Sequence, residues 1–487
     1  MKQPFSLRKL PVLFSMMLAA CAVGPDYTQP DAGLPTSWQA ALPHAGTQAG
    51  LINWWAQFND PVLVRLLQAA ETDNPTLNKA VAAIDQSRAA IISSRADMFP
   101  NFTGRASSTG ASATPPATGT QTTTGVAIDA AWEIDLFGSV RRSTEAAQAR
   151  LQGAEQDWHQ ARVSLAAEVA SSYTTYRGCQ LLVATAQRET DSRRETARLT
   201  GISVGAGFTA PADGNLATAS AASASAALTA QRAQCDLTVK SLVALTGLEE
   251  PALRKLLGST APALPVSAGF AVDNLPVALV SQRPDLASAE RALAAASAEV
   301  GVAVANRYPR LSLTGSISYG VIDLAGRSTE ASSWSFGPAL TVPLFDAGKR
   351  RALVDAAEAR YDQALANYRQ SVRNAVKEVE QALVSLDSAA QREGDAQTAK
   401  DSSQKYFNAV ETNWRSGGVG LIFLEDARRT AITAEVNLIN LQRDRVLDWI
   451  ALYKALGGDW QQRAPAASVA SNSQNPAAQS APGQPEK

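Results

Sequence analysis

The chain has few of the residues that usually carry catalysis or bind transition metals. Its 487 residues include two histidines, three cysteines and four methionines. His44 and His159 have no partner in the sequence that completes a catalytic triad or a metal-binding pair. A glycine-rich phosphate loop, a clustered Cys/His spacing and a Gly-x-Ser-x-Gly motif are all absent. We therefore predict no catalytic residue, no metal site and no cofactor.

Long apolar runs and a strong net charge are also absent. Beyond the N-terminal segment, no stretch approaches the roughly 18 to 20 consecutive apolar residues of a transmembrane helix. A chain of this kind crosses a membrane only as β-strands. Lys and Arg number 44 against 45 Asp and Glu, and no cluster of basic residues appears. This balance argues against nucleic acid as a partner.

What the chain does contain is an internal repeat with an offset of about 210 residues. The clearest recurrences are residues 99–102 (FPNF) as 308–311 (YPRL), 136–138 (LFG) within 344–348 (LFDAG), and 244–247 (ALTG) as 455–458 (ALGG). The order of expected elements also repeats: a short helix, a strand pair, a very long helix, a glycine-containing turn and another helix. A duplication of this size predicts two tandem structural units placed side by side.

The N-terminal segment has the pattern of an export signal. Three basic residues precede a short apolar segment that ends at Leu18-Ala19-Ala20-Cys21. This segment is too short to span a bilayer, which favours a cleaved signal peptide over residues 1–20. A cysteine at this place resembles the bacterial lipoprotein signal, in which Cys21 is lipidated and becomes the first mature residue. The alternative is an ordinary signal peptide with an incidental cysteine. Ala22 after the cysteine favours sorting to the outer membrane.

Two segments, about 99–137 and 308–345, show the alternation of β-hairpins. In residues 126–136 every second side chain is apolar, which places the apolar set on one face of a sheet. Such two-faced strands fit a soluble, half-buried sheet or a membrane barrel with an aqueous lumen. Expected strand lengths of about ten residues, with aromatic residues near the strand ends, favour the barrel.

The hairpin loops are predicted at the Gly/Thr/Ser-rich residues 110–125 and the polar residues 323–333. Four strands per chain cannot close a membrane barrel, since the smallest known ones need about eight. The chain is therefore expected to oligomerise if its strands form a barrel.

Two segments without proline, about 139–206 and 347–416, predict helices of unusual length. At 1.5 Å per residue each reaches about 100 Å. Shorter helices are expected at about 75–98, 212–247, 283–306 and 421–457, and small apolar residues suit their antiparallel coiled-coil packing against the long helices. The predicted organisation is an N-terminal arm (21–60), a first repeat (61–250), a linker (251–282), a second repeat (283–460) and a disordered tail (461–487).

Cys179 and Cys235 lie symmetrically about Gly207, in the turn expected between two antiparallel helices. Both cysteines then lie at one level of the helical pair. In an oxidising compartment this layout predicts a disulfide, with two buried free thiols as the alternative.

Several motifs together identify a family resemblance over residues 21–460. The chain resembles the NodT-type outer-membrane factors, the lipoprotein branch of TolC-like efflux channels. The motifs are residues 21–27 (CAVGPDY), 54–61 (WWAQFNDP), 282–290 (QRPDLASAE), 308–311 (YPRL) and 342–346 (VPLFD).

This resemblance implies an α+β fold in which a membrane β-barrel, with four strands per chain and twelve in a homotrimer, continues into a long antiparallel coiled-coil tunnel across the periplasm. It also implies a Gram-negative outer-membrane lipoprotein that docks on a periplasmic adaptor (membrane fusion protein) and an inner-membrane pump, commonly of the resistance-nodulation-division (RND) type. The implied function is the passive exit duct of a tripartite efflux pump that exports drugs and other toxic amphiphiles, with no enzymatic activity.

The resemblance further implies a gate near the second helical turn, with an acidic ring at Asp426 and an apolar constriction at Ile422. The alternative for Asp426 is an ion pair with Arg429 or Arg428 on the helix surface. Relatives carry a further Asp directly after the turn glycine, where this chain has Val419 and Gly420. A second acidic ring is therefore not expected.

The two helical turns are the expected adaptor-docking surface, with Gly207 and Phe208 in the first turn and Gly417 and Gly418 in the second. Three carboxylates fall on the polar face of the first hairpin: Asp129, Glu133 and Asp135. As a lumen lining they favour cations, or else they merely solubilise a wide lumen without selectivity; we favour the second interpretation.

Two other function classes fit the composition less well. A coiled-coil lipoprotein that tethers the envelope needs no two-faced hairpins. A lipoprotein enzyme finds no catalytic constellation in this sequence.

Overall fold

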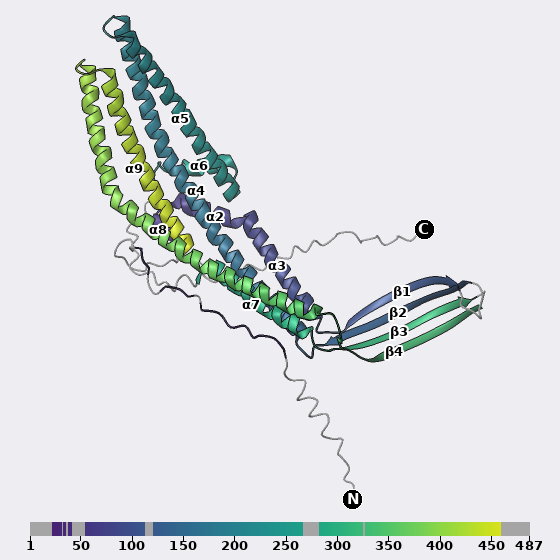
Figure 1. Cartoon of the computed structure of the whole chain (residues 1–487). Coiled ribbons are helices and arrows are strands. Elements are labelled where there is room, and N and C mark those ends of the chain that lie inside the picture. Colours follow the sequence, from purple (N-terminus) through teal and green to yellow (C-terminus); the bar gives the residue numbers. More distant parts are fainter. Residues whose placement is uncertain are drawn as a thin grey trace, which may run out of the picture.

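The computed structural model describes residues 22–31, 33–35, 38–40, 54–112, 120–265, 282–324 and 327–458. The predicted signal peptide (1–20), Cys21 and the predicted tail (461–487) lie outside these residues. The elements in chain order are η2 (Trp54–Phe58), α2 (Pro61–Thr72), α3 (Pro75–Ala96), β1 (Asn101–Ser112), β2 (Thr120–Ile134), α4 (Ser139–Gly205), α5 (Pro211–Thr246), α6 (Glu250–Leu257), α7 (Pro284–Ala305), β3 (Arg310–Leu324), β4 (Arg327–Thr341), α8 (Lys349–Arg415) and α9 (Leu421–Ala455). The strands extend from one end of the helical part, and the α4–α5 and α8–α9 turns lie at the other end (Figure 1).

The first helices begin where capping residues precede proline. The Asp60 carboxylate accepts hydrogen bonds from the backbone N–H groups of Val62 and Leu63, at 2.9 and 3.2 Å. The Asn74 side chain accepts one from Thr76 N at 2.9 Å. A proline occupies the first helical position after each cap, where its missing N–H costs nothing. The predicted start of the helix at about residue 75 is confirmed.

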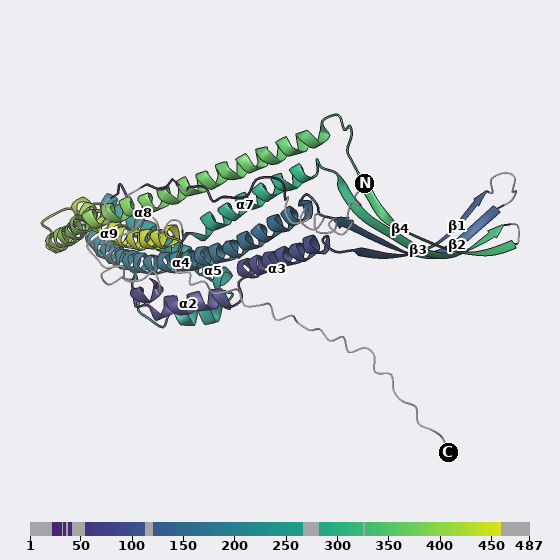
Figure 2. The same cartoon turned by 90° about the horizontal axis from the view of Figure 1, so that it is seen from below.

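The duplication is nearly exact in length. Helices α4 and α8 both have 67 residues, and α3 and α7 both have 22. Each long helix ends within two residues of its predicted bounds. Figure 2 shows α3, α4, α7 and α8 side by side, with α4 in contact with α3 and α7, and α7 in contact with α8. Helix α5 packs along α4 and α9 along α8, as the antiparallel prediction requires. Among the described helices, none carries an apolar stretch long enough to cross a membrane.

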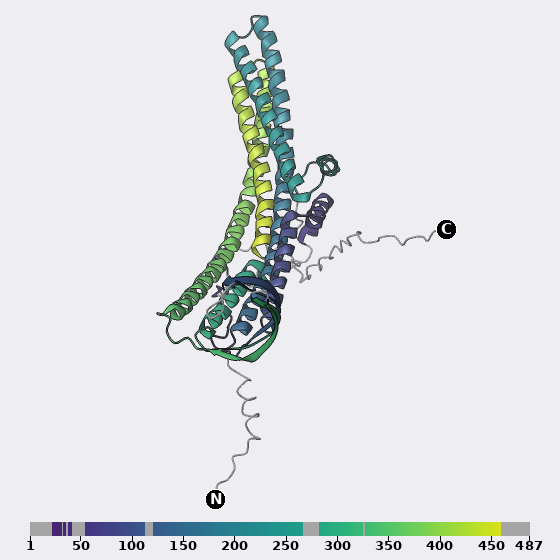
Figure 3. The same ribbon diagram turned by 90° about the vertical axis from the view of Figure 1, so that its right-hand side faces the viewer.

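The four strands form one antiparallel sheet in the order β1-β2-β3-β4. Figure 3, seen from the side of the sheet, shows it as a curved band. The predicted loop bounds were wrong, because β1 has 12 residues and the other strands have 15, so pairing continues well into 110–125 and 323–333. Thr124 and Ser333, which lie in the predicted loops, pair across strands instead: Thr124 with Ser108 at 2.8 Å and Ser333 with Ser318 at 2.7 Å between hydroxyl oxygens.

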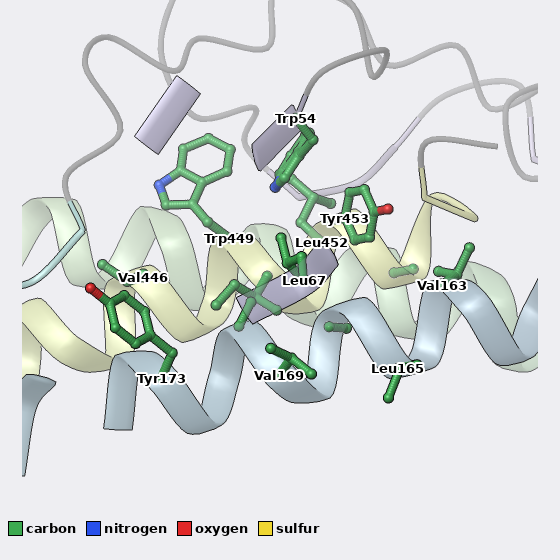
Figure 4. Packing of buried hydrophobic residues seen from close by; sticks show 14 of the residues in the cluster. Trp54, Leu67, Val163, Leu165, Val169, Tyr173, Val446, Trp449, Leu452 and Tyr453 are labelled. Carbon is green, nitrogen blue, oxygen red and sulfur yellow. The ribbon is translucent and has the colours of Figure 1, made fainter. Parts of the chain in front are cut away.

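The main hydrophobic core lies beside η2 and α2, where α4, α8 and α9 converge. Trp54 is 2% exposed, and its ring centroid lies 5.3 Å from that of Tyr453 and 6.4 Å from that of Trp449. Figure 4 shows these α9 rings next to Trp54, with Val169 and Tyr173 of α4 on the other side of the cluster. Buried aromatic rings remove a large apolar area from water and so contribute strongly to packing at this level of the molecule.

The start of the second repeat is fixed by one buried arginine. Arg283, 4% exposed, donates to both carboxylate oxygens of Asp285, at 2.9 and 2.7 Å. It also donates to the Glu378 carboxylate of α8 at 2.8 Å and to the Ala455 carbonyl of α9 at 2.7 Å. One side chain therefore joins the start of α7, the middle of α8 and the end of α9.

The predicted linker 251–282 is not free of regular structure. Its first residues belong to α6, which buries Leu253 and Leu257 completely. Pro251 lies in the first turn of this helix, which a proline tolerates. The helix is too short to show a clear periodicity in the sequence. Residues 266–281 lie outside the described part of the chain.

Candidate functional site

The two helical turns far from the sheet have the same backbone geometry. Gly207 and Gly417 both adopt the left-handed conformation, with φ of +76° and +80°. The N–H of the following residue donates back to the helix in each case, from Phe208 N to Ser203 O and from Gly418 N to Asn413 O, both at 2.9 Å. This is the Schellman arrangement, which suits glycine because it has no Cβ. The two tips are therefore equivalent in backbone.

The side chains of the tips differ. Phe208 is 87% exposed at the first tip, and Gly418 takes the equivalent place in the second. A Cβ on Gly418 would lie 2.0 Å from Asn413 Oδ1, the end of a side chain that can move. The chain thus places an exposed aromatic ring directly after the turn glycine at the first tip, whereas at the second tip the nearest exposed ring is Phe423, 59% exposed, in the first turn of α9.

Ile422 and Asp426 lie one turn apart on the exposed face of α9, with Ile422 63% exposed. The Asp426 carboxylate pairs with Arg429, and the two side chains are 59% and 75% exposed. Of the two surface ion pairs considered from the sequence, the one with Arg429 is present in the single chain. An ion pair this exposed contributes about 0 to 1 kcal/mol, so it leaves the carboxylate free to take other partners.

Arg428 lies on the opposite, buried face of α9. Its guanidinium is 1% exposed, pairs with Glu425 and donates to Thr196 Oγ1 of α4 at 2.8 Å. It also stacks over the Phe407 ring of α8, with 5.5 Å between Cζ and the ring centroid. Burial lowers the pKa of the Arg428 guanidinium below its ordinary value.

The Glu425 carboxylate connects this arginine to the other helical hairpin. It pairs with Arg193 of α4 and accepts a hydrogen bond from Ser220 Oγ of α5 at 2.9 Å. We call Arg193, Glu425 and Arg428 the tip network, because it joins all four helices near the tips. Sequence reasoning missed it, although Glu425 and Arg428 already stand at i and i+3; the partner on α4 becomes visible only when the two repeats pack together.

The sheet has one strongly apolar face that is exposed in the single chain. Ile128, Ile317 and Trp334 form one rung across β2, β3 and β4, and they are 60%, 70% and 79% exposed. Next to this rung a hollow of about 440 Å³ is lined by apolar side chains that include Phe102 and Phe336. Exposure of this much apolar surface on one face indicates contact with lipid or protein.

The opposite face carries two of the three predicted carboxylates, each beside an arginine. Asp129 lies 3.7 Å from Arg105, and Glu133 lies 3.9 Å from Arg310, measured between the charged atoms. The positions of Asp129 and Glu133 on the polar face agree with the predicted alternation. Their charges are partly balanced, which weakens the cation-favouring interpretation.

Asp135 has a different place from the one expected. Strand β2 ends at Ile134, and the Asp135 carboxylate accepts a hydrogen bond from Arg141 N at 2.9 Å in the first turn of α4. Asp346 does the same for α8, with Arg350 N at 3.2 Å. A carboxylate at a helix N-terminus is stabilised by the unpaired N–H groups there. Asp135 is thus a helix-start residue rather than part of the strand face.

The disulfide prediction agrees with the structure. Cys179 of α4 and Cys235 of α5 are joined by a disulfide, with Cα atoms 5.6 Å apart. Cys179 is 4% exposed. The second repeat has Ala389 and Val446 at this level, so the bridge belongs to one hairpin only and has the character of a structural link.

Cys21, the predicted lipidation site, lies outside the described residues, but the segment that follows it packs against the helices. Val23 N donates to the Phe137 carbonyl at 3.1 Å, and Arg142 pairs with Asp26 at 2.6 Å. A Cβ on Gly24 would lie 2.4 Å from Gly301 Cα, so backbone packs on backbone there. The residues after Cys21 are therefore held where the helices meet the sheet.

Neither histidine indicates a site. His44 lies outside the described residues, and burial lowers the pKa of the His159 imidazole. Within the described ranges no group of three or more His, Cys, Asp or Glu side chains is placed to hold a metal ion.

Comparison with known proteins agrees with this architecture. The family model described as "Outer membrane efflux protein" matches residues 66–248 and 275–458, one match for each repeat. The chain is 31% identical to the solvent efflux pump outer membrane protein SrpC of Pseudomonas putida, over 93% of this chain and 98% of that protein. It is 29% identical to nodulation protein T of Rhizobium leguminosarum bv. trifolii, over 91% and 94%.

A solved structure of the outer-membrane channel OprN is similar to this chain, with a TM-score of 0.79, 31% identity and coverage of 90% of this chain and 99% of that one. Matches of this extent, with two family repeats and the same helix-and-strand architecture, leave one assignment. The chain belongs to the outer membrane efflux protein family and is an efflux channel of the outer membrane, not an enzyme.

Proposed function

We propose that three copies of this chain form the channel and close a twelve-stranded barrel. The observation that carries this proposal is the single chain's sheet: β1 and β4 are edge strands, and one face exposes a continuous apolar band. Edge strands have unpaired backbone N–H and C=O groups that can pair with another chain. With four strands per copy, three copies supply the twelve strands of the barrel. The apolar face then contacts lipid and the polar face lines the lumen.

The channel is a lipoprotein in this proposal, with Cys21 as the lipidated residue after removal of residues 1–20. Support comes from the packing of residues 22–27 at the junction of the helices and the sheet. If the apolar band of the sheet lies in the outer membrane, the packing of residues 22–27 holds the lipid on Cys21 at the periplasmic face of the same membrane. Anchor and barrel then fix the channel at one depth.

The far ends of the helices lie in the periplasm and carry the gate. Three copies of Asp426 around a narrow axis repel one another and favour cations, and three copies of Ile422 narrow the opening. The exposed positions of both side chains on one face of α9 support this assignment.

The tips themselves, Gly207 with Phe208 and Gly417 with Gly418, dock on a periplasmic adaptor. The adaptor in turn belongs to an inner-membrane pump, which we propose to be of the RND type. The equivalent backbone of the two tips and the exposed Phe208 ring support a protein-binding role for the tips. The channel supplies no energy and no catalysis, and the pump and adaptor deliver the cargo.

The proposed cargo is a range of small toxic amphiphiles, including drugs and solvents. The name of the similar SrpC protein refers to solvent efflux. A wide passive duct does not need an enclosed, shape-selective pocket. The open hollows along this chain agree with such a duct.

Single-channel conductance of the purified, lipidated protein in planar bilayers tests the proposal. Wild type should give discrete, mostly closed events, and Asp426→Ala should give larger or more frequent openings. Asp85→Ala is a matched control, because it removes an exposed i,i+3 pair with Arg88 on α3, far from the tips. Openings unaffected by Asp426→Ala would reject the gate but keep the duct. Absence of conductance from a folded trimer would reject the duct in favour of an envelope tether.

A further inference from the structure

A basic hollow of about 950 Å³ lies where α4, α7 and α8 meet the base of the sheet. Seven charged side chains line it, five of them positive: Arg150, Arg310, Lys349, Arg350 and Arg360, against Glu299 and Asp346. The function described so far makes no use of this cluster.

The hollow is continuous with the polar face of the sheet. Arg310 is the first residue of β3, and it alternates with Leu311, whose rung partner Leu340 is exposed on the apolar face. The Arg310 guanidinium reaches Glu133 on the polar face, 3.9 Å away. Arg310 therefore belongs to the polar face and also lines the hollow. In a barrel the polar face is the lumen side.

Helix α7 separates the hollow from the N-terminal arm. The N-terminal arm contacts one face of α7, at Glu290 and Gly301. The residues of α7 that line the hollow, such as Glu299 and Ala303, are about half a helical turn away from Gly301, at roughly 100° per residue. Arm and hollow therefore lie on opposite sides of the helical wall.

The carboxylates near the hollow are already paired. Glu299 pairs with Arg150, and Asp346 pairs with Arg350 at 3.4 Å. With Glu133 beside Arg310, three carboxylates balance three of the five cations. Lys349 and Arg360 are exposed, and within the described part of the chain neither forms an ion pair with a carboxylate. Among the described residues, the lining of the hollow thus contains two positive charges without an ion-pair partner.

We propose that this hollow is an anion station of the duct, which favours cargo bearing a carboxylate, phosphate or sulfonate group at the junction of helices and barrel. The inference rests on the proposed trimeric duct, in which three copies bring six surplus positive charges around one lumen. Clefts lined by one sign of charge concentrate ions of the opposite sign. The junction thus attracts anions, whereas the Asp426 ring at the far end favours cations.

Ion selectivity of the full-length lipidated trimer tests the station. The zero-current potential is measured in planar bilayers under a tenfold gradient of KCl, and it gives the chloride-to-potassium permeability ratio of wild type. Lys349→Gln combined with Arg360→Gln should lower the chloride-to-potassium permeability ratio at least about twofold. The charge-retaining pair Lys349→Arg with Arg360→Lys should keep the wild-type ratio.

The matched control is Arg254→Gln with Lys255→Gln, which removes one Arg and one Lys from α6, away from the hollow. It should leave the ratio unchanged. As a second readout, naphthalene-2-sulfonate should block the wild-type current more than a naphthyl trimethylammonium cation does, and the Gln pair should remove this difference.

A ratio that is unchanged in the Gln pair would overturn the anion station while leaving the duct intact. Absence of any conductance would instead count against the proposed function itself. The size of the single-channel current shows whether each variant has formed a channel, so a folding defect is not mistaken for lost selectivity.

Discussion

Glu425 and Asp426 are neighbours in α9, yet their carboxylates lie in opposite environments. The Glu425 side chain is 12% exposed and binds Arg193 and Arg428, whereas the Asp426 side chain is 59% exposed and pairs with Arg429. The first carboxylate holds the four helices together near the tips. The second is available at the surface for the proposed gate.

This contrast predicts that two adjacent substitutions lower the free energy of unfolding by very different amounts. Glu425→Ala leaves Arg428 buried without its carboxylate, which should cost about 3 kcal/mol of unfolding free energy. Asp426→Ala removes an exposed pair and should cost less than about 1 kcal/mol. Guanidinium unfolding followed by circular dichroism measures both. Equal losses would show that the tip network does not carry stability.

The disulfide predicts a redox-dependent stability confined to the first hairpin. Cys179 and Cys235 are 56 positions apart, and closing a loop of that length stabilises the folded state by up to about 4 kcal/mol. Cys179→Ser with Cys235→Ser should lower the unfolding midpoint, and a reductant should lower that of wild type to the same value. A reductant without effect on wild type would indicate that the thiols are not bridged.

The exposed Phe208 ring predicts a separation between conductance and export. Phe208→Ala should leave single-channel currents in bilayers unchanged, since the ring makes no contribution to the folded wall. In cells that depend on this channel it should reduce tolerance of a toxic amphiphile, because an aromatic anchor at an interface is commonly worth about tenfold in affinity or more. Tyr406→Ala, which truncates a half-exposed ring of α8 above the tip, is the control. Equal tolerance in both variants would remove Phe208 from the docking surface.

Asp448 predicts a pH-dependent stability. Burial, reinforced by the nearby Asp444, raises the pKa of this carboxyl to about 6, while Arg392 acts in the opposite direction. An unfolded Asp titrates near about 4, so the folded chain holds the proton more tightly. Stability from this group is therefore present below about pH 4, is lost as the pH rises through about 6, and stays lost above it.

Asp448→Asn removes the penalty for a buried charge, so it should raise the unfolding midpoint at about pH 8 and leave it unchanged at about pH 4. Hydrogen bonds to Gln397 and Lys400 lower the pKa of the exposed Asp401, so Asp401→Asn should give no stabilisation at the higher pH. A higher midpoint for Asp448→Asn at both values would point to packing rather than charge.

Much of this fold could be predicted because the chain marks its own boundaries. Capping residues followed by proline, as at Asp60 and Asn74, and glycine beyond helix ends, as at Gly207 and Gly417, determine where helices begin and end. The period of two in the strands assigned Ile128 and Asp129 to opposite faces. The strand ends were missed because Ser and Thr serve turns and exposed strands equally well.

The site was less predictable because its contacts are tertiary. Glu425 looks like one more surface carboxylate until Arg193, more than two hundred positions earlier, is packed against it. Asp135 fits the strand alternation, yet its carboxylate accepts a hydrogen bond from Arg141 N in the helix that follows. The basic hollow combines residues of α4, α7, α8 and β3, which no local pattern connects.

The equal length of α4 and α8 has a consequence for how such a molecule can change over time. Both helices have 67 residues, and each lies beside a shorter helix that leads back from its tip. An insertion of one heptad into α4 alone would move its tip outward by about 10 Å relative to that of α8. It would also shift the register between α4 and α5, unless α5 gained the same seven residues. The distance from the sheet to the tips can therefore lengthen or shorten only through matched insertions in all four tip helices, so that the length of the helical part changes as one unit.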